Sequence, residues 1–221
     1  MRGRLKEFIP LRLRVRFGGI FKREKVFLLE RTLTDASFNI EVDVEVDIRL
    51  VQREDFLRIT DRFRKLRIEE IGLAHFLPST TLLKKRFEMG HICIATDIRG
   101  DFVNLLWAAF HEVYAGLLER KMRMSSDLVF LYGFYTVPKH RGLGILPKAL
   151  GKAFNYLYER GIRKVYACIR HDNFPSLRAV QKVGFRKIGT ITYTRIFKLR
   201  LYRCEGETEE DHKKLKWMFS F

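Results

Sequence analysis

The chain has 221 residues, of which 47% are hydrophobic and 19 are phenylalanine, so it is long enough to bury a sizeable core. It contains no apolar run of about 18 residues, no signal-peptide pattern, and three scattered cysteines without metal-site or disulfide spacing. We therefore expect a cytoplasmic protein without a metal site. The formal net charge of +17 favours anionic partners without choosing among phosphorylated cofactors, nucleic acids and acidic lipids.

Residues 1–40 predict a basic N-terminal β-hairpin extension. Apolar and basic residues alternate over 11–21, Gly18 and Gly19 suit a tight turn, and a second strand is expected near 25–31. Basic residues interleaved with apolar ones favour contact with nucleic acid or an anionic membrane. A solvated strand face explains the same pattern, and both interpretations stay open.

Residues 41–200 are predicted to form the main domain, and 201–221 a C-terminal helical tail. The valine–charge alternation over 41–51 predicts a strand, and the polar stretch 112–127 predicts a loop or short helix. The next predicted elements are helices over about 53–67 and, after the Pro78-Ser79 start signal, over 80–88, and then a hairpin over 91–96 and 102–110. A buried strand follows over 128–137, in which Gly133 suggests a bulge, and then a helix over 145–160 that Gly161 ends. The last elements are a strand over 164–170, a helix from 173 to 184, and one or two strands over 185–197.

The turn between the strand 128–137 and the next helix carries the main chemical signal. It contains Arg141, Gly142, Leu143, Gly144, Ile145 and Leu146. Amides at a helix start have no intrahelical partners and carry the positive end of the helix dipole, and glycines admit a phosphate without an obstructing Cβ. Taken alone, this Gly-x-Gly pattern is equally typical of a structural turn.

Further residues make the chain resemble the GCN5-related N-acetyltransferase (GNAT) superfamily. The turn residues match the family's Arg/Gln-x-x-Gly-x-Gly/Ala pattern, with Pro138 ahead of them. Downstream lie the Asn173-x-x-Ser176 helix start and the Gly184-Phe185 pair. The resemblance covers roughly 45–197. It implies an α/β (α+β) fold with a mixed, mostly antiparallel twisted sheet flanked by helices.

The sequence departs from the family pattern at two positions. Leu146 replaces the final Gly or Ala of the turn, so its side chain must point away from a bound phosphate. Val180 stands where many members carry a tyrosine that protonates the departing thiolate. The usual assignment of the catalytic acid therefore does not carry over.

By resemblance, acetyl-CoA or another acyl-CoA binds in a cleft between the fourth and fifth core strands. Its pyrophosphate would bind residues 141–146, and its pantetheine arm would pair with the backbone of Phe134, Tyr135 and Thr136. Asn173 would help to close the site, although it equally suits a helix cap. Ser176 is a further candidate for cofactor binding, for which a structural role is the favoured interpretation. Tyr135, Tyr132 and Glu112, with His111 and His171 as further possibilities, are the candidate catalytic groups.

The predicted activity is transfer of an acetyl group to the amine of a small molecule by direct attack on the thioester. Two alternatives stay open. One is a non-catalytic GNAT-fold module that binds an anionic polymer or membrane, and the other is an enzyme that uses a longer acyl donor or an acyl carrier protein. The sequence leaves the acceptor undetermined and a homodimer open.

Overall fold

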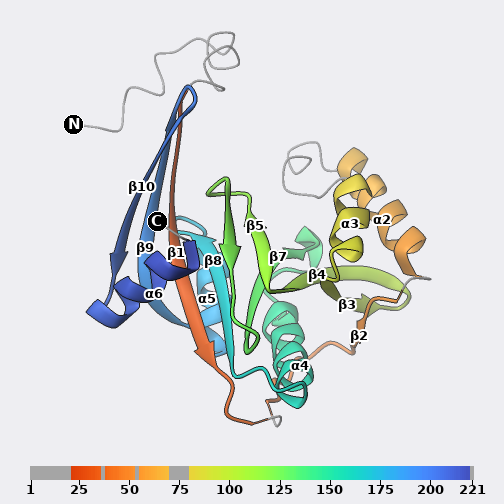
Figure 1. Cartoon of the computed structure of the whole chain (residues 1–221). Helices are drawn as coiled ribbons and strands as arrows, with labels where there is room; N and C mark the ends of the chain where they lie inside the picture. Colours follow the sequence, from red (N-terminus) through yellow and green to blue (C-terminus); the bar gives the residue numbers. More distant parts are fainter. Residues whose placement is uncertain (1–20, 36–37, 53–54, 70–79, 220–221) are drawn as a thin grey trace.

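The computed structural model describes residues 21–35, 38–52, 55–69 and 80–219, and every structural statement below concerns these residues. Figure 1 shows a central sheet with helices on both faces. Its eight strands are β1 (Phe21–Thr32), β2 (Asp47–Leu50), β3 (Ile92–Ile98), β4 (Asp101–Phe110), β7 (Leu128–Thr136), β8 (Lys164–Arg170), β9 (Arg186–Ile196) and β10 (Leu199–Gly206). The helices are α2 (Asp55–Glu69), α3 (Thr80–Glu88), α4 (Ile145–Glu159), α5 (Phe174–Lys182) and α6 (Glu209–Phe219).

The strand order in the sheet is β10-β9-β1-β8-β7-β4-β3-β2. Every pair is antiparallel except β7 and β8, which run parallel and are joined through α4. The predicted mixed, mostly antiparallel sheet flanked by helices is therefore confirmed. A separate two-stranded sheet is formed by β5 (Glu112–Ala115) and β6 (Arg120–Arg123).

The core is divided between the two faces of the large sheet. On one face α4 and α5 pack against the central strands, with Ala149, Leu150 and Phe154 of α4 fully buried. On the other face α2 and α3 cover the β3–β4 end, while α6 and the β5–β6 hairpin cover the β1–β9 end. Gly161, at φ +82°, ends α4 in the left-handed region, as the sequence predicted.

Two sequence predictions are wrong. The expected strand over 41–51 is reduced to β2, because β3 offers pairing partners to four of its residues, Asp47–Leu50. Residues 112–127 form neither a plain loop nor a helix but the β5–β6 hairpin, which buries Val113, Leu118 and Met122 against the large sheet. The remaining helices and strands of the main domain lie where the sequence placed them.

The terminal segments also differ from expectation. The predicted strand near 25–31 is part of β1, which lies inside the sheet between β9 and β8 rather than ahead of it. Residues 201–206 belong to β10, so the C-terminal helix begins only at Glu209. Three predicted features lie outside the described residues, namely the alternating segment before residue 21, its Gly18-Gly19 turn, and the Pro78-Ser79 helix start.

The described ranges contain no helix whose length and apolar character would let it span a membrane.

Candidate functional site

The sheet opens between its two parallel strands. β7 and β8 are paired from Leu128 to Phe130, and beyond that point neither strand has paired residues on the side that faces the other. Because β7 continues to Thr136 and β8 to Arg170, the two strands part and leave a wedge at their carboxyl ends. Ligands of α/β sheets bind at such a position.

The predicted bulge at Gly133 is present in β7. Trp107 of β4 pairs with Tyr132 and Leu105 pairs with Tyr135, so two residues of β7 face the single Leu106. Gly133 has φ +63°, and an added Cβ would lie 3.1 Å from the Trp107 ring. Glycine is therefore required here by both backbone conformation and space.

The glycine turn joins β7 to α4 through the short 3₁₀ helix η2 (Pro138–His140). Gly142 and Gly144 have φ values of +83° and +73°, so both occupy the left-handed region. Arg141 donates from Nε to the Thr136 carbonyl at 3.0 Å and ties the turn to the end of β7. Pro147 lies in the first turn of α4, where its missing N–H costs no helical hydrogen bond.

The amides of this turn are left open by the described backbone. In the described chain, no backbone carbonyl accepts a hydrogen bond from the N–H groups of residues 142–146. His140 and Arg141 do donate, to Val137 and Pro138, which fixes the preceding turn. The amide row from Gly142 to Leu146 is therefore available to an anion at the positive end of the α4 dipole.

These elements enclose a cleft of about 510 Å³. Its lining includes most of the predicted cofactor residues, namely Phe134, Tyr135, Thr136, Arg141, Gly142, Gly144, Ile145, Leu146, Asn173 and Ser176. Leu143 is the exception, because its side chain is exposed outside the cleft. Leu146 also packs against the core with its side chain, as the departure from the family pattern requires.

The start of α5 borders the opposite side of the cleft. The Asn173 side chain accepts a hydrogen bond from the Ser176 amide at 3.3 Å and caps this helix. Both functions considered for Asn173 are thus compatible, since the same residue caps α5 and lines the cleft.

Sequence reasoning missed the cationic residues of this wall. His140, Arg178 and Lys182 line the cleft, and the described lining contains no acidic side chain. Partial burial, followed by the nearby charges of Lys139 and Arg62, lowers the pKa of His140. Arg178 and Lys182 could have been predicted from the sequence, because they follow Pro175 at helical spacing in the helix that Asn173 caps.

The candidate catalytic residues are not brought together. Tyr135 lines the cleft, whereas Tyr132 and Glu112 lie outside it. The Tyr132 hydroxyl is 2.5 Å from His91 Nδ1, and burial raises the Tyr132 pKa. Glu112 belongs to β5 and forms an ion pair with Lys121 at 2.7 Å.

The two histidines considered from sequence also lie outside the cleft lining. His111 sits at the turn from β4 into β5, with φ +64°. The ring of His171 lies against Phe27, and its amide donates to the Lys25 carbonyl, so it anchors the end of β8 to β1.

The family model described as "Acetyltransferase (GNAT) family" matches residues 79–185. Similar solved structures include a GCN5-related N-acetyltransferase from Sphaerobacter thermophilus (12% identity, TM-score 0.57) and a putative GNAT-family acetyltransferase from Novosphingobium aromaticivorans (15%, TM-score 0.51). A Drosophila protein is 14% identical with a TM-score of 0.53. No curated protein matches the chain.

These structural matches cover 85%, 85% and 86% of this chain, respectively. The chain spans 56%, 66% and 59% of the other three, less than two thirds of each. At these identities the likeness concerns the fold, which is that of the GNAT acetyltransferases. Together with the matching family model, it identifies residues 79–185 as a GNAT-family domain.

Proposed function

We propose that this chain is an acyl-CoA-dependent N-acyltransferase that transfers acetyl from acetyl-CoA to the amine of a small molecule. The observation that carries the proposal is the row of unused amides from Gly142 to Leu146, which borders a cleft without acidic lining. A diphosphate fits this environment, because its negative charge would be met by oriented N–H groups and by Arg178 and Lys182.

The wedge between β7 and β8 suits the rest of the cofactor. An extended amide-containing arm can pair with the open edge of β7 beyond Phe130, as an added strand would. When bound, the thioester supplies an already activated acyl group, so positioning of the amine accounts for much of the rate. An amide beside the Gly133 bulge then stabilises the developing negative charge on the carbonyl oxygen.

Tyr135 is the candidate proton donor that the cleft retains. Val180, at the position of the usual family acid, is fully buried in the core and has no ionisable group. Tyr132 and Glu112 are not among the lining residues and do not enter the proposal. We therefore assign catalysis chiefly to backbone groups and proximity.

The test compares two glycines of matched strain. Gly142 and Gly161 have φ values of +83° and +82°, and an added Cβ at either position meets no atom within 4 Å. Gly142→Ala and Gly161→Ala should therefore lose similar stability, about 1 kcal/mol each. Only Gly142→Ala places a methyl group among the amides of the turn.

Acetyl-CoA at about 100 times its Kd should raise the Tm of the wild type and of Gly161→Ala by roughly 5–10 °C. The shift for Gly142→Ala should be much smaller. An equal shift in both variants would remove the turn from the site. Release of free thiol with a panel of small amines tests turnover, and binding without any thiol release would favour the non-catalytic module.

A further inference from the structure

The long strands β1, β9 and β10 form an arm that extends beyond the body of the molecule. We use "the arm" for residues 21–25 of β1, 192–196 of β9 and 199–203 of β10. β8 pairs with β1 only from Val26 onward, so the arm lies past the end of its neighbour. In Figure 1 the turn between β9 and β10 lies at the top, away from α4 and α5, whose first turns line the cleft.

The two faces of the arm differ sharply. Tyr193 and Tyr202 pair across β9 and β10 and point toward the core. The opposite, outer face carries the pairs Phe21–Ile196 and Ile196–Leu199, and Leu201 follows on the same face. With Phe197 at the turn, these five large apolar side chains are 40–67% exposed.

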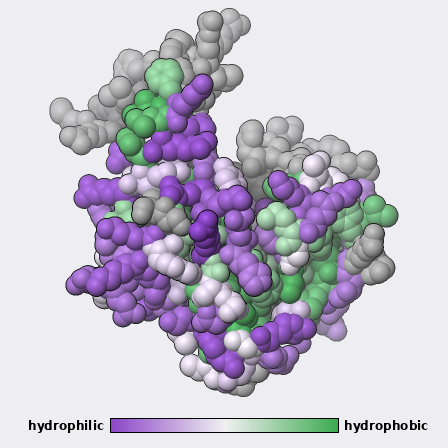
Figure 2. All heavy atoms as spheres, viewed as in Figure 1, coloured by the Kyte–Doolittle hydropathy of each residue, from purple (hydrophilic) through white to green (hydrophobic). Residues whose placement is uncertain are grey.

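Cationic residues adjoin this apolar patch. Arg23 and Lys25 follow Phe21 on the outer face, Arg203 follows Leu201, and Lys198 occupies the turn. Arg203 pairs with Glu205, whereas no described carboxylate pairs with Arg23, Lys25 or Lys198. Figure 2 shows the hydrophobic patch at the top of the arm, bordered by hydrophilic surface.

The turn itself is not optimised for folding. Phe197 is the first of two residues that connect the Ile196–Leu199 pair, and its φ is +53°. This left-handed conformation favours Gly or Asn and is unfavourable for an aromatic residue. The sequence thus places a bulky apolar side chain at an exposed tip despite local backbone strain. Strain retained at an exposed position points to function.

Charge selects the occupant of this surface. A second copy of the chain carries the same +17 and is repelled, and residues 1–20 contain six basic residues against one acidic residue. The occupant must therefore be anionic and must also accept aliphatic side chains such as Ile196, Leu199 and Leu201. A bilayer with acidic headgroups provides both, whereas nucleic acid offers phosphates and bases but no medium for aliphatic groups.

We propose that the outer face of the arm docks on anionic lipid, with Phe197 and Leu199 entering the acyl region and Arg23, Lys25 and Lys198 contacting headgroups. This interaction is independent of the acyltransferase proposal. It would hold the protein at a membrane surface by its arm.

The decisive variant is Phe197→Asn, because its effects on folding and on docking have opposite signs. Asn suits the left-handed turn, so the variant should unfold at the same or a higher temperature than the wild type. Its binding to vesicles of 70% phosphatidylcholine and 30% phosphatidylglycerol should nevertheless fall, and Phe197→Asn/Leu199→Ser should fall about tenfold or more in sedimentation assays. Leu57→Ser removes an apolar side chain of α2 that is even more exposed, and it should leave vesicle binding unchanged.

The charges are tested separately. Arg23→Gln/Lys25→Gln should weaken binding to these vesicles roughly fivefold per charge, and pure phosphatidylcholine vesicles should bind far less of the wild type. Binding that is lost in Arg12→Gln/Arg14→Gln/Arg16→Gln but kept in all arm variants would overturn the proposal. The proposal would also be overturned if Phe197→Asn/Leu199→Ser bound vesicles as well as the wild type, or if a single-stranded oligonucleotide displaced the protein from the vesicles. A wild-type dimer that this double variant converts to a monomer would overturn it as well.

Discussion

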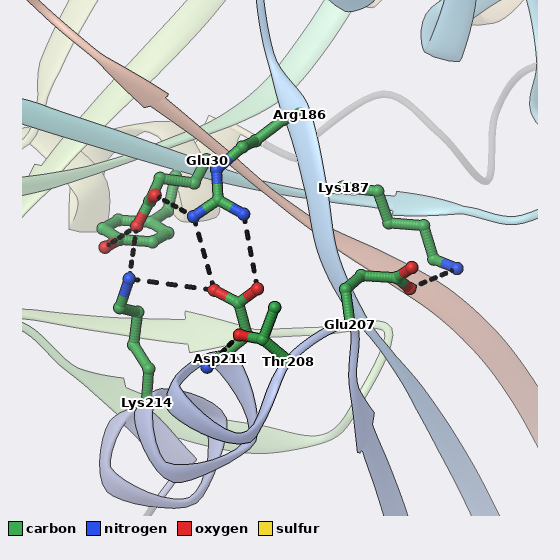
Figure 3. A network of polar contacts seen from close by, with 8 residues as sticks. Glu30, Arg186, Lys187, Glu207, Thr208, Asp211 and Lys214 are labelled. Atoms are coloured by element: carbon green, nitrogen blue, oxygen red, sulfur yellow. Dashed lines mark hydrogen bonds and ion pairs between the residues drawn. The ribbon is translucent and has the colours of Figure 1, made fainter.

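The two ends of the sheet use polar groups in opposite ways. At the β1–β9 end, Glu30 is 3% exposed and accepts hydrogen bonds from Arg186, Lys214 and Tyr166. Figure 3 shows this network, in which Arg186 also reaches Asp211 of α6. At the β7–β8 end, by contrast, the amides from Gly142 to Leu146 find no backbone acceptor among the described residues. The molecule is held together where polar groups are satisfied, and we place ligand binding where they are not.

Glu30→Gln gives the largest expected effect and tests the satisfied end. Removing the charge should lower the free energy of unfolding at pH 7 by about 3 kcal/mol, measured by urea denaturation. Figure 3 contains the matched control, since Glu207 also forms a 2.7 Å ion pair, with Lys187, but is 46% exposed. Glu207→Gln should cost less than about 0.5 kcal/mol. If both variants lost the same small free energy of unfolding, burial would not distinguish the ion pairs of Glu30 from that of Glu207.

Acid should remove the same stabilisation. Burial opposes ionisation of Glu30, but hydrogen bonds from Lys214 and Tyr166 outweigh it and lower the Glu30 pKa from 4.5 to about 2. Because the folded-state pKa is the lower one, the contribution is complete above pH 4.5 and is lost as the pH falls toward 2. The stability difference between wild type and Glu30→Gln should therefore shrink over this interval. A difference that stays constant down to pH 2 would contradict this assignment.

Gly133→Ala tests the other end. The substitution adds left-handed strain and places a methyl group 3.1 Å from Trp107 and 3.3 Å from Arg86, so we expect a loss of about 2 kcal/mol. The control is Gly90→Ala, with φ +73° and open space, which should lose about 1 kcal/mol from strain alone. Differential scanning calorimetry with and without acetyl-CoA should show a reduced ligand shift only for Gly133→Ala. Equal ligand shifts in both variants would show that the bulge does not take part in binding acetyl-CoA.

Arg178→Gln should give the smallest effect. Because Arg178 lines the cleft without a described carboxylate partner, the Kd for acetyl-CoA should rise roughly fivefold in isothermal titration calorimetry. The rise should be smaller at high salt, since exposed charges are screened. Lys213→Gln removes one charge from α6, outside the cleft lining, and should leave the Kd unchanged. If both variants weaken binding alike, the net charge of the chain is responsible instead of the cleft.

The sequence predicted best those features that depend on local chemistry. Gly133, Gly142 and Gly161 were identified as bulge, turn and helix end because left-handed conformations demand glycine, and each has positive φ. The prediction for residues 41–51 failed because alternation shows that a strand can form but not how long its partner is. The catalytic candidates were chosen by nearness in sequence to the predicted core strands. Tyr132 consequently proved to face His91, on the side opposite α4.

The internal position of β1 was likewise beyond sequence reasoning. Pairing of Val26 with Arg170 and Ile191 joins segments that no local pattern connects. In contrast, the sequence could have predicted that Arg178 and Lys182 line the cleft, because their helical spacing in α5 places them on one face of a helix that was located correctly.

The location of β1 also bears on how the chain is made. This strand leaves the ribosome before both of its partners, because β8 begins at Lys164 and β9 at Arg186. Until those two strands have been synthesised, Val26, Leu28 and Leu29 therefore lack the strands that bury them. Folding of this part of the sheet must wait for β8 and β9, and a fragment limited to residues 79–185 would expose the unpaired edge of β8 to aggregation.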